Sequence, residues 1–391
     1  MRASPLEVVA DTPTLVSTAG STDLAALDRA TEAAAAAGAR IVIVSGSVGA
    51  GHDGVAHELA DRLRERGHPV AVLDMLDGFP LLVRILLSSA YVLTIRLAPW
   101  VYESTCWLVE RSRVFQRLAD AICCSAAGWL AEATVGADLI VATYPPAGRA
   151  LGRLKRTQAL AAPVVTYLTD PAPNYLWVHA DVDLHLTASQ ATAAETETTY
   201  GIPVEAAGPL VARAFRVTDR AGARSHLETA LGVPPSTRVA LVVLGSLGVG
   251  NVRSAVRALT AAGMLPIVLC GRNERLRRRL QRMPGALALG WRDDVPALLA
   301  GSDLVVHNAG GLSLTESLVA GVPAITFASL PGHGRANART LERSGMAPWA
   351  RSPEQLTEMA LAVNATEIGR WPVGEETAAQ RISELADASR D

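Results

Sequence analysis

Residues 304–318, LVVHNAGGLSLTESL, decide the fold of the second half of the chain. A short β-branched run leads through a glycine pair into a helix-forming stretch, which is typical of a parallel strand followed by a tight turn and a helix. The first amides of such a helix are unpaired and lie at the positive end of its dipole, so the backbone of Gly310, Gly311 and Ser313 can bind a diphosphate. Glu316 lies one turn inside the helix, where its carboxylate can accept both hydroxyls of a ribose or serve as a capping-box acid.

The first half of the chain contains a matching unit. The strand-like run 40–45 is followed by SGSVGAGH at 45–52 and then by a helical stretch. Gly49 and Gly51 permit a sharp turn and the close approach of a ligand, but the GxGxxG spacing of a dinucleotide site is absent. His52 stands at a helix start, where it can accept a proton from an alcohol; the alternative is a capping or loop histidine.

Apolar strand-like runs alternate with helical stretches along the whole chain. This alternation is typical of doubly wound parallel sheets, whose ligands bind at the carboxyl ends of the strands, and it predicts two Rossmann-like domains that face one cleft. The runs are 40–45, 70–74, 138–143, 164–169 and 184–187 in the first half and 239–244, 266–270, 286–289, 304–307 and 324–327 in the second. The predicted organisation is a leader with an Ala-rich helix (1–38), an N-terminal domain (39–212), a linker (213–235) and a C-terminal domain with a C-terminal helix (236–391).

The composition excludes several classes of protein. With 391 residues, 49% of them hydrophobic, and a net charge of −2, the chain is globular and has no global attraction to nucleic acid. Its four cysteines form no CxxC pair, so no zinc site or disulfide framework is expected. The apolar region 79–108 is interrupted by charged residues, which excludes a membrane span there, and no secretory signal is present. We therefore expect a cytoplasmic protein.

Five motifs follow one another along the chain. They are the glycine loop ending in His52, the strand exit Cys270-Gly271-Arg272-Asn273, the segment 290–303 from Gly290-Trp291, the segment 309–316, and Pro331-Gly332 to Asn337. In this order they resemble one family, the monogalactosyldiacylglycerol synthases and processive diacylglycerol glucosyltransferases, relatives of the lipid II-forming N-acetylglucosaminyltransferase. The similarity covers about residues 40–350.

The resemblance implies a GT-B fold and an inverting transfer of a hexose from a UDP-sugar, used as a co-substrate without a cofactor, to a hydroxyl of a lipid or lipid-linked acceptor. His52 would be the catalytic base, assisted by Asp170. At 333 and 334, His and Gly stand where the family has Gln and Glu. Donor-binding candidates are Gly245, Ser246, Gly248, Arg272, Asn273, Ala309, Gly310, Gly311, Ser313, Glu316, His333 and Asn337; acceptor-binding candidates in the N-terminal domain are Gly49, Gly51, Tyr91, Trp100, Trp177 and His179.

Charge on the departing diphosphate would be handled by helix-end amides and Arg272, so no metal site is expected. The triplet Asp181-Val182-Asp183 has the DxD pattern of a metal site. It opens a strand of the first domain, away from the predicted donor site, so we do not assign a metal to it. The stretch 81–115 mixes aromatic, apolar and basic residues, which suits a helix lying in a membrane interface or a helical pair packed on the sheet. We therefore expect a cytoplasmic protein that can attach peripherally to the cytoplasmic face of the membrane.

Three other functions remain open from the sequence. The acceptor can belong to an antibiotic or cell-envelope pathway, as a natural product or a polyprenyl-phosphate-linked molecule. A UDP-sugar 2-epimerase shares the fold and needs no acceptor, but it leaves the apolar stretch 81–115 without a purpose. A non-catalytic partner of another transferase is the third, and the intact His52, Glu316 and glycine loops argue against it.

Overall fold

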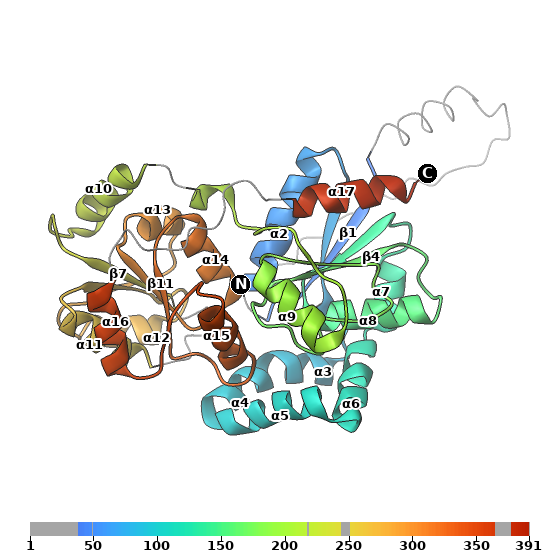
Figure 1. The fold of residues 1–391 in the computed structure, drawn as a ribbon, viewed down its shortest axis with the longest axis horizontal. Coiled ribbons are helices and arrows are strands. Elements are labelled where there is room, and N and C mark those ends of the chain that lie inside the picture. The colour runs from blue at the N-terminus through green and yellow to red at the C-terminus, as the bar shows by residue number, and fades with distance from the viewer. Residues whose placement is uncertain (1–37, 49, 217–218, 244–250, 364–376, 391) are drawn as a thin grey trace, which may run out of the picture. The chain divides into compact units, whose positions relative to one another are not determined.

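The computed structural model describes residues 38–48, 50–216, 219–243, 251–363 and 377–390. Residues 39–391 form one compact unit. It contains two six-stranded sheets, and every strand pairs in parallel with its neighbours. The α/β, doubly wound fold expected from the sequence is confirmed (Figure 1).

The first sheet has the strand order β2-β1-β3-β4-β5-β6. Every strand-like run of the first half of the sequence forms one of its strands. Helices cover both faces of the sheet, so successive side chains of β1, β3 and β4 are all buried and these strands read as nearly continuous apolar runs. The sequence did not predict β6, which is a two-residue edge strand. The bounds are β1 Ile41–Ser45, β2 Val70–Asp74, β3 Leu139–Ala142, β4 Val164–Leu168, β5 Leu184–Thr187 and β6 Glu205–Ala206.

The second sheet has the order β12-β11-β10-β7-β8-β9. Its central strands are again apolar runs predicted from the sequence, and the two-residue edge strand β12 is the one that was not predicted. The bounds are β7 Val239–Val243, β8 Leu265–Leu269, β9 Leu287–Leu289, β10 Leu304–His307, β11 Ala324–Phe327 and β12 Trp349–Ala350.

Helices cover both faces of the first sheet. On β1, Ile41 and Ile43 face a core shared with α2 and α17, whereas Val42 and Val44 face the core shared with α7 and α8. We call this sheet with its helices the first lobe. Its helices are α2 Ala50–Glu65, α7 Ala127–Ala133, α8 Pro145–Arg156, α9 Gln190–Tyr200 and α17 Ala378–Ala388.

The C-terminal helix α17 packs in the first lobe, although the sequence-based organisation assigned residues 236–391 to the second domain. Ala378, Ala379 and Ile382 are buried in the core that contains α2, and Arg381 pairs with Glu205 of β6. Figure 1 shows α17, in red, beside the blue α2. The physical reason is that the apolar face of α17 is buried against residues of α2 and the first sheet, which are far from it in the sequence.

The second lobe consists of the second sheet and its helices. The segment 213–235, expected to be a linker, contains α10, whose Leu227 is buried in the core of this lobe, so most of it is part of the lobe. The helices are η3 Arg213–Phe215, α10 Arg220–Leu231, α11 Val252–Ala261, α12 Glu274–Leu280, α13 Val295–Ala300, α14 Gly311–Val319, α15 His333–Arg343 and α16 Pro353–Ala362.

A group of helices is inserted between β2 and β3, and Figure 1 shows it as a teal layer. Many of its large apolar side chains are exposed, among them Leu82, Leu97, Trp100 and Trp107. We call the helices α3–α6 the insertion. Its elements, after η1 Met75–Gly78, are α3 Leu81–Ile85, η2 Leu86–Ala90, α4 Tyr91–Leu97, α5 Pro99–Arg111 and α6 Arg113–Cys124.

Candidate active site between the two lobes

Three neighbouring strands of the first sheet deliver the residues around His52. The strands β1, β3 and β4 lie side by side, and because they are parallel their carboxyl ends meet at one edge. His52 lies in the first turn of α2 after β1, Thr143 directly follows β3, and Thr169 directly follows β4. The topology therefore brings together three residues that are distant in sequence.

The imidazole of His52 is held by one of its nitrogens. Nδ1 lies 3.0 Å from the carbonyl oxygen of Thr143 and 2.9 Å from the hydroxyl of Thr169. A carbonyl oxygen only accepts hydrogen bonds, so we assign the proton of the neutral ring to Nδ1, which leaves a lone pair on Nε2. The rings of Tyr144 and Trp177 pack around it, with centroids 5.4 and 5.9 Å away. A neutral imidazole with a lone pair on Nε2 can accept a proton from an alcohol.

Asp170 is held by a different set of partners. Its Oδ2 accepts a hydrogen bond from the indole Nε1 of Trp177 at 2.9 Å, and its Oδ1 accepts one from Nδ2 of Asn337 at 3.2 Å. Within the described part of the chain, no hydrogen bond joins Asp170 to His52. The groups that orient His52 are thus Thr143 and Thr169, while Asp170 connects the first lobe to Asn337 of the second.

On the second lobe, a strained turn leads from β10 into α14. Ala309 has φ +69°, an uncommon conformation for a residue with a side chain. Its N–H donates to Nδ1 of the fully buried His307, whose Nε2 lies 3.1 Å from the hydroxyl of Thr326 on β11. Gly310 is the N-cap residue and supplies no side chain to the first turn of α14. The amides of this turn, including that of Ser313, are therefore placed where an anion can bind.

Glu316 is a half-buried carboxylic acid on α14. No hydrogen bond or ion pair to it exists among the residues that the structure describes, and burial raises its pKa to about 8. An acid with no protein partner is costly unless a ligand or a proton satisfies it. The carboxyl group is consequently suited to hydroxyls that come from outside the protein.

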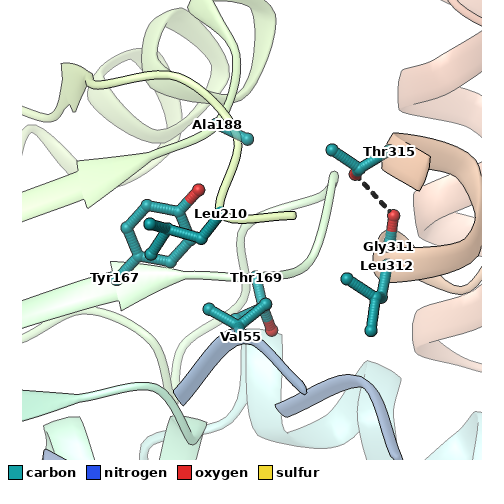
Figure 2. A pocket seen from close by; sticks show the side chains of 8 residues that line it. All are labelled: Val55, Tyr167, Thr169, Ala188, Leu210, Gly311, Leu312 and Thr315. Carbon is teal, nitrogen blue, oxygen red and sulfur yellow. Dashed lines mark hydrogen bonds between the residues drawn. The ribbon is translucent and has the colours of Figure 1, made fainter. Parts of the chain in front are cut away.

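The two lobes touch directly beside these residues. A Cβ on Gly311 would lie 2.1 Å from the carbonyl oxygen of Thr169, so close backbone packing between the lobes requires a glycine there. A Cβ on Gly54 would lie 2.7 Å from the end of the Leu312 side chain, which can move aside. Gly51, expected to meet an acceptor, also faces Leu312. A small pocket remains at this junction, large enough for about one water molecule. Figure 2 shows its lining side chains, which come from both lobes: Val55, Tyr167, Thr169, Ala188, Leu210, Gly311, Leu312 and Thr315.

The loop after β11 continues into α15 and also reaches the first lobe. Nδ1 of His333 lies 2.8 Å from the hydroxyl of Tyr102 on α5. The fully buried amide of Asn337 donates to the carbonyl oxygen of Ala309 as well as to Asp170, and it accepts a hydrogen bond from the backbone N–H of Ala172. His333 and Asn337, both expected at the donor site, thus lie beside Asp170 at the junction of the lobes.

Other predicted site residues lie elsewhere or have structural partners. Arg272 stacks on the ring of Trp291, and Asn273 caps α12 by accepting from the N–H of Leu276. His179 is buried against α8, where burial lowers its pKa to about 4, and Trp100 is exposed on the insertion. Gly49, Gly245, Ser246 and Gly248 lie outside the described residues, as does the side chain of Tyr91.

The sequence did not identify Thr143 or Tyr102 as site residues. Thr143 acts through its backbone carbonyl, which has no sequence signature, and Tyr102 is one aromatic residue among several on α5. In the described ranges, the structure contains no group of three or more His, Cys, Asp or Glu side chains that could hold a metal ion. No helix in the same ranges is long and apolar enough to cross a bilayer.

Comparison with known proteins identifies families and structures to which the chain is similar. The model of the monogalactosyldiacylglycerol (MGDG) synthase family matches residues 52–209, a segment that begins at His52 and includes Asp170. The chain resembles this family. A processive diacylglycerol β-glucosyltransferase of Bacillus cereus is 23% identical over 338 residues, which are 81% of this chain and 83% of the relative. The resemblance expected from the sequence is confirmed.

Solved structures show the same fold. Acinetobacter baumannii MurG is 17% identical, with a TM-score of 0.54, and the match covers 89% of this chain and 99% of that protein. Os79 from O. sativa, solved in complex with UDP, is 14% identical with a TM-score of 0.57 and coverage of 90% and 100%. The chain therefore has the GT-B fold.

Proposed function

We propose that the protein is an inverting glycosyltransferase that moves a hexose from a UDP-sugar to a hydroxyl of a lipid or lipid-linked acceptor. The observation that carries the proposal is the presence, at one lobe junction, of three groups: a histidine with a lone pair on Nε2, a helix start, and a carboxyl group that has no partner among the described residues. The first suits an alcohol nucleophile, and the other two suit a nucleoside diphosphate. The similarity to a processive diacylglycerol β-glucosyltransferase and to the MGDG synthase family supports this chemistry.

In the proposed reaction, Nε2 of His52 takes the proton of the acceptor hydroxyl while that oxygen attacks the anomeric carbon of the donor. The bond from this carbon to the UDP oxygen breaks on the opposite face, so the anomeric configuration inverts. The imidazolium that forms is stabilised by the carbonyl oxygen of Thr143 at Nδ1. Asp170, held by Trp177 and Asn337, adds negative charge close to this site.

The departing UDP would be bound by the second lobe. The ribose hydroxyls would donate to Glu316, and the diphosphate would lie against the first amides of α14, with Arg272 adding positive charge. These groups can replace a metal ion in stabilising the leaving group, so we propose that transfer needs neither a metal nor another cofactor.

The exposed side of the insertion would lie on a membrane, and the acceptor would reach the site from that membrane. Trp100 is 70% and Trp107 54% exposed, and the guanidinium of Arg111 lies 5.1 Å from the ring centroid of Trp107. Exposed indoles and leucines next to arginines are typical of a surface that lies in the headgroup region of a bilayer. This supports a lipid acceptor over a water-soluble one.

The test is incubation with radiolabelled UDP-sugars and a bacterial lipid extract, with and without EDTA. We expect labelled lipid and free UDP in both reactions. A rearranged UDP-sugar without labelled lipid would identify an epimerase, and no reaction with any donor would indicate a non-catalytic partner. Loss of transfer in EDTA, restored by Mg²⁺ or Mn²⁺, would contradict the metal-independent mechanism.

A further inference from the structure

We propose that Tyr102 and Glu103 of α5 are positioning residues that hold the segment 331–337 and thereby set the preference of the enzyme for its donor sugar. This segment consists of Pro331, Gly332 and the first residues of α15, and we call it the turn. The inference rests on the proposed function and adds a determinant of sugar recognition that lies outside the nucleotide-binding lobe. It assigns a role to the inner face of α5, whose outer face carries the exposed Trp100 and Trp107.

Tyr102 fixes the side chain of His333. The phenolic oxygen lies 2.8 Å from Nδ1 of His333, and the two rings are perpendicular with centroids 5.7 Å apart. A hydrogen bond at one ring nitrogen together with an edge contact determines the rotation of the imidazole. These two contacts, both made by α5, thus contribute to the orientation of the His333 ring.

The same helix contacts two further residues of the turn, Gly332 and Arg335. Both carboxylate oxygens of Glu103 accept from Nη1 of Arg335, at 2.8 and 2.6 Å. Gly332 has φ +66°, and a Cβ there would lie 2.7 Å from Sγ of Cys106 and 3.0 Å from the ring of Tyr102. Positions 102, 103 and 106 lie on one side of a helix, so α5 contacts three successive parts of the turn with one face.

The turn lies beside the reacting groups. His333 lies near the carboxylate of Asp170, and burial lowers the pKa of His333. At the other end of the turn, Asn337 donates to Asp170. The turn is thus anchored to the insertion at one end and to Asp170 of the first lobe at the other, next to the proposed base. The nucleotide, by contrast, would be bound by α14. Loss of the α5 contacts should therefore change recognition of the sugar and leave recognition of the nucleotide intact.

The test compares UDP with several UDP-hexoses in wild type and Tyr102→Phe, which keeps the ring but removes the hydroxyl. Loss of one hydrogen bond should raise the KM for the preferred UDP-hexose about 3–10-fold. The ratio of kcat/KM for this donor to kcat/KM for the other UDP-hexoses should fall by a similar factor. The Kd for UDP should stay within about twofold, and the thermal midpoint should hardly change. An unchanged KM and unchanged preference in a folded Tyr102→Phe would overturn the inference.

A charge exchange provides a second, independent readout. Glu103→Arg and Arg335→Glu should each raise the KM for the UDP-hexose, and the double variant should restore it, because the ion pair is re-formed in reverse. Glu342→Arg breaks the ion pair with Arg351, away from this turn, and should have no such effect. Equal loss of UDP and UDP-hexose binding in the two single variants, or no restoration in the double variant, would contradict a positioning role. A wild-type protein that binds no UDP would instead refute the proposed function together with this inference.

Discussion

At the residue scale, the feature that matters most is the assignment of protons on His52. Thr143 contributes a carbonyl oxygen, which can only accept, and this fixes the lone pair on Nε2. A helix cap or loop histidine would not need a carbonyl from another strand to define its tautomer. The geometry therefore favours a catalytic over a structural role for this side chain.

His52→Ala should lower kcat by about 10²–10⁴-fold, the usual contribution of general-base catalysis. UDP affinity should remain within a few-fold of wild type, because the groups proposed to bind UDP lie on α14. Transfer kinetics and UDP titration calorimetry check both expectations. As a matched control, His57→Ala alters an exposed histidine one turn later on the same helix and should retain activity. Near-normal turnover by His52→Ala would make Asp170 the better candidate for the base.

The pKa of Glu316, raised to about 8 by burial, predicts pH-dependent binding of UDP. Two ribose hydroxyls require an ionised carboxylate as acceptor, and at pH 7 only about a tenth of the free protein has one. Affinity for UDP should therefore increase about tenfold between pH 7 and pH 9. Glu316→Gln should bind UDP more weakly and without this pH dependence, whereas Glu274→Gln, at an exposed acid, should behave as wild type. A flat titration of wild type would refute the ribose assignment.

At the element scale, the insertion shows how one set of helices can have two functions. Its outer surface is apolar and basic, while the inner face of α5 contacts the turn 331–337 of the second lobe. The sequence showed the mixture of aromatic and basic residues but left open whether they pack on the sheet. In the structure, the exposed residues Leu81, Leu82, Leu93, Leu97, Trp100, Trp107, Val114 and Leu118 lie on α3–α6 and are not covered by either lobe.

We expect the protein to sediment with anionic liposomes at low salt, and Trp100→Ser with Trp107→Ser to weaken this binding. Burial of each indole should contribute on the order of 1–2 kcal/mol, and the arginines add an attraction that salt screens. Trp291→Ser removes an equally exposed indole on the second lobe and should bind as wild type. Equal binding by the Trp100/Trp107 variant would show that this surface does not meet the bilayer.

At the scale of the whole molecule, α15 connects the lobes along its length. Arg335 near its start pairs with Glu103 of α5, Asn337 donates to Asp170, and at its end Arg343 pairs with Glu195 of α9. The second lobe thus contacts the first through one helix as well as through Gly311 and Leu312.

Buried histidines predict a loss of stability in mild acid. His179, His185 and His307 are neutral in the fold, each with its pKa lowered to about 4 by burial, whereas in the unfolded chain they titrate near 6.5. Their stabilisation is complete above pH 6.5 and is lost as the pH falls to about 4, on the order of 3 kcal/mol each. Glu316 acts in the opposite direction, because its raised pKa makes protonation favour the fold between pH 8 and 4.5.

Urea unfolding at pH 7, 6 and 5 should therefore show a free energy of unfolding that falls with pH. The stability lost through the three histidines exceeds the stability gained through Glu316. Glu316→Gln removes the opposing group and should steepen the fall, while His185→Gln should make it shallower. A free energy of unfolding that does not change over this range would contradict the burial of these rings as neutral groups.

The sequence by itself determined the two sheets and the loops that carry His52 and Glu316. Runs of β-branched residues, glycine turns and helix starts are local signals, so β1–β5 and β7–β11 follow from short windows of the chain. The edge strands β6 and β12 have two residues each and too little pattern to predict.

Only the tertiary structure decided which residues complete the site. The contact of His52 with Thr143 spans 91 residues, and that of Tyr102 with His333 spans 231. Neither contact has a local signal, because one partner is a backbone carbonyl and the other is an ordinary helix tyrosine. The same holds for α17, whose apolar face could cover either sheet and is buried on the first. Local patterns determine secondary structure, whereas these pairings depend on the order of strands in each sheet and on how the lobes close, which no short segment specifies.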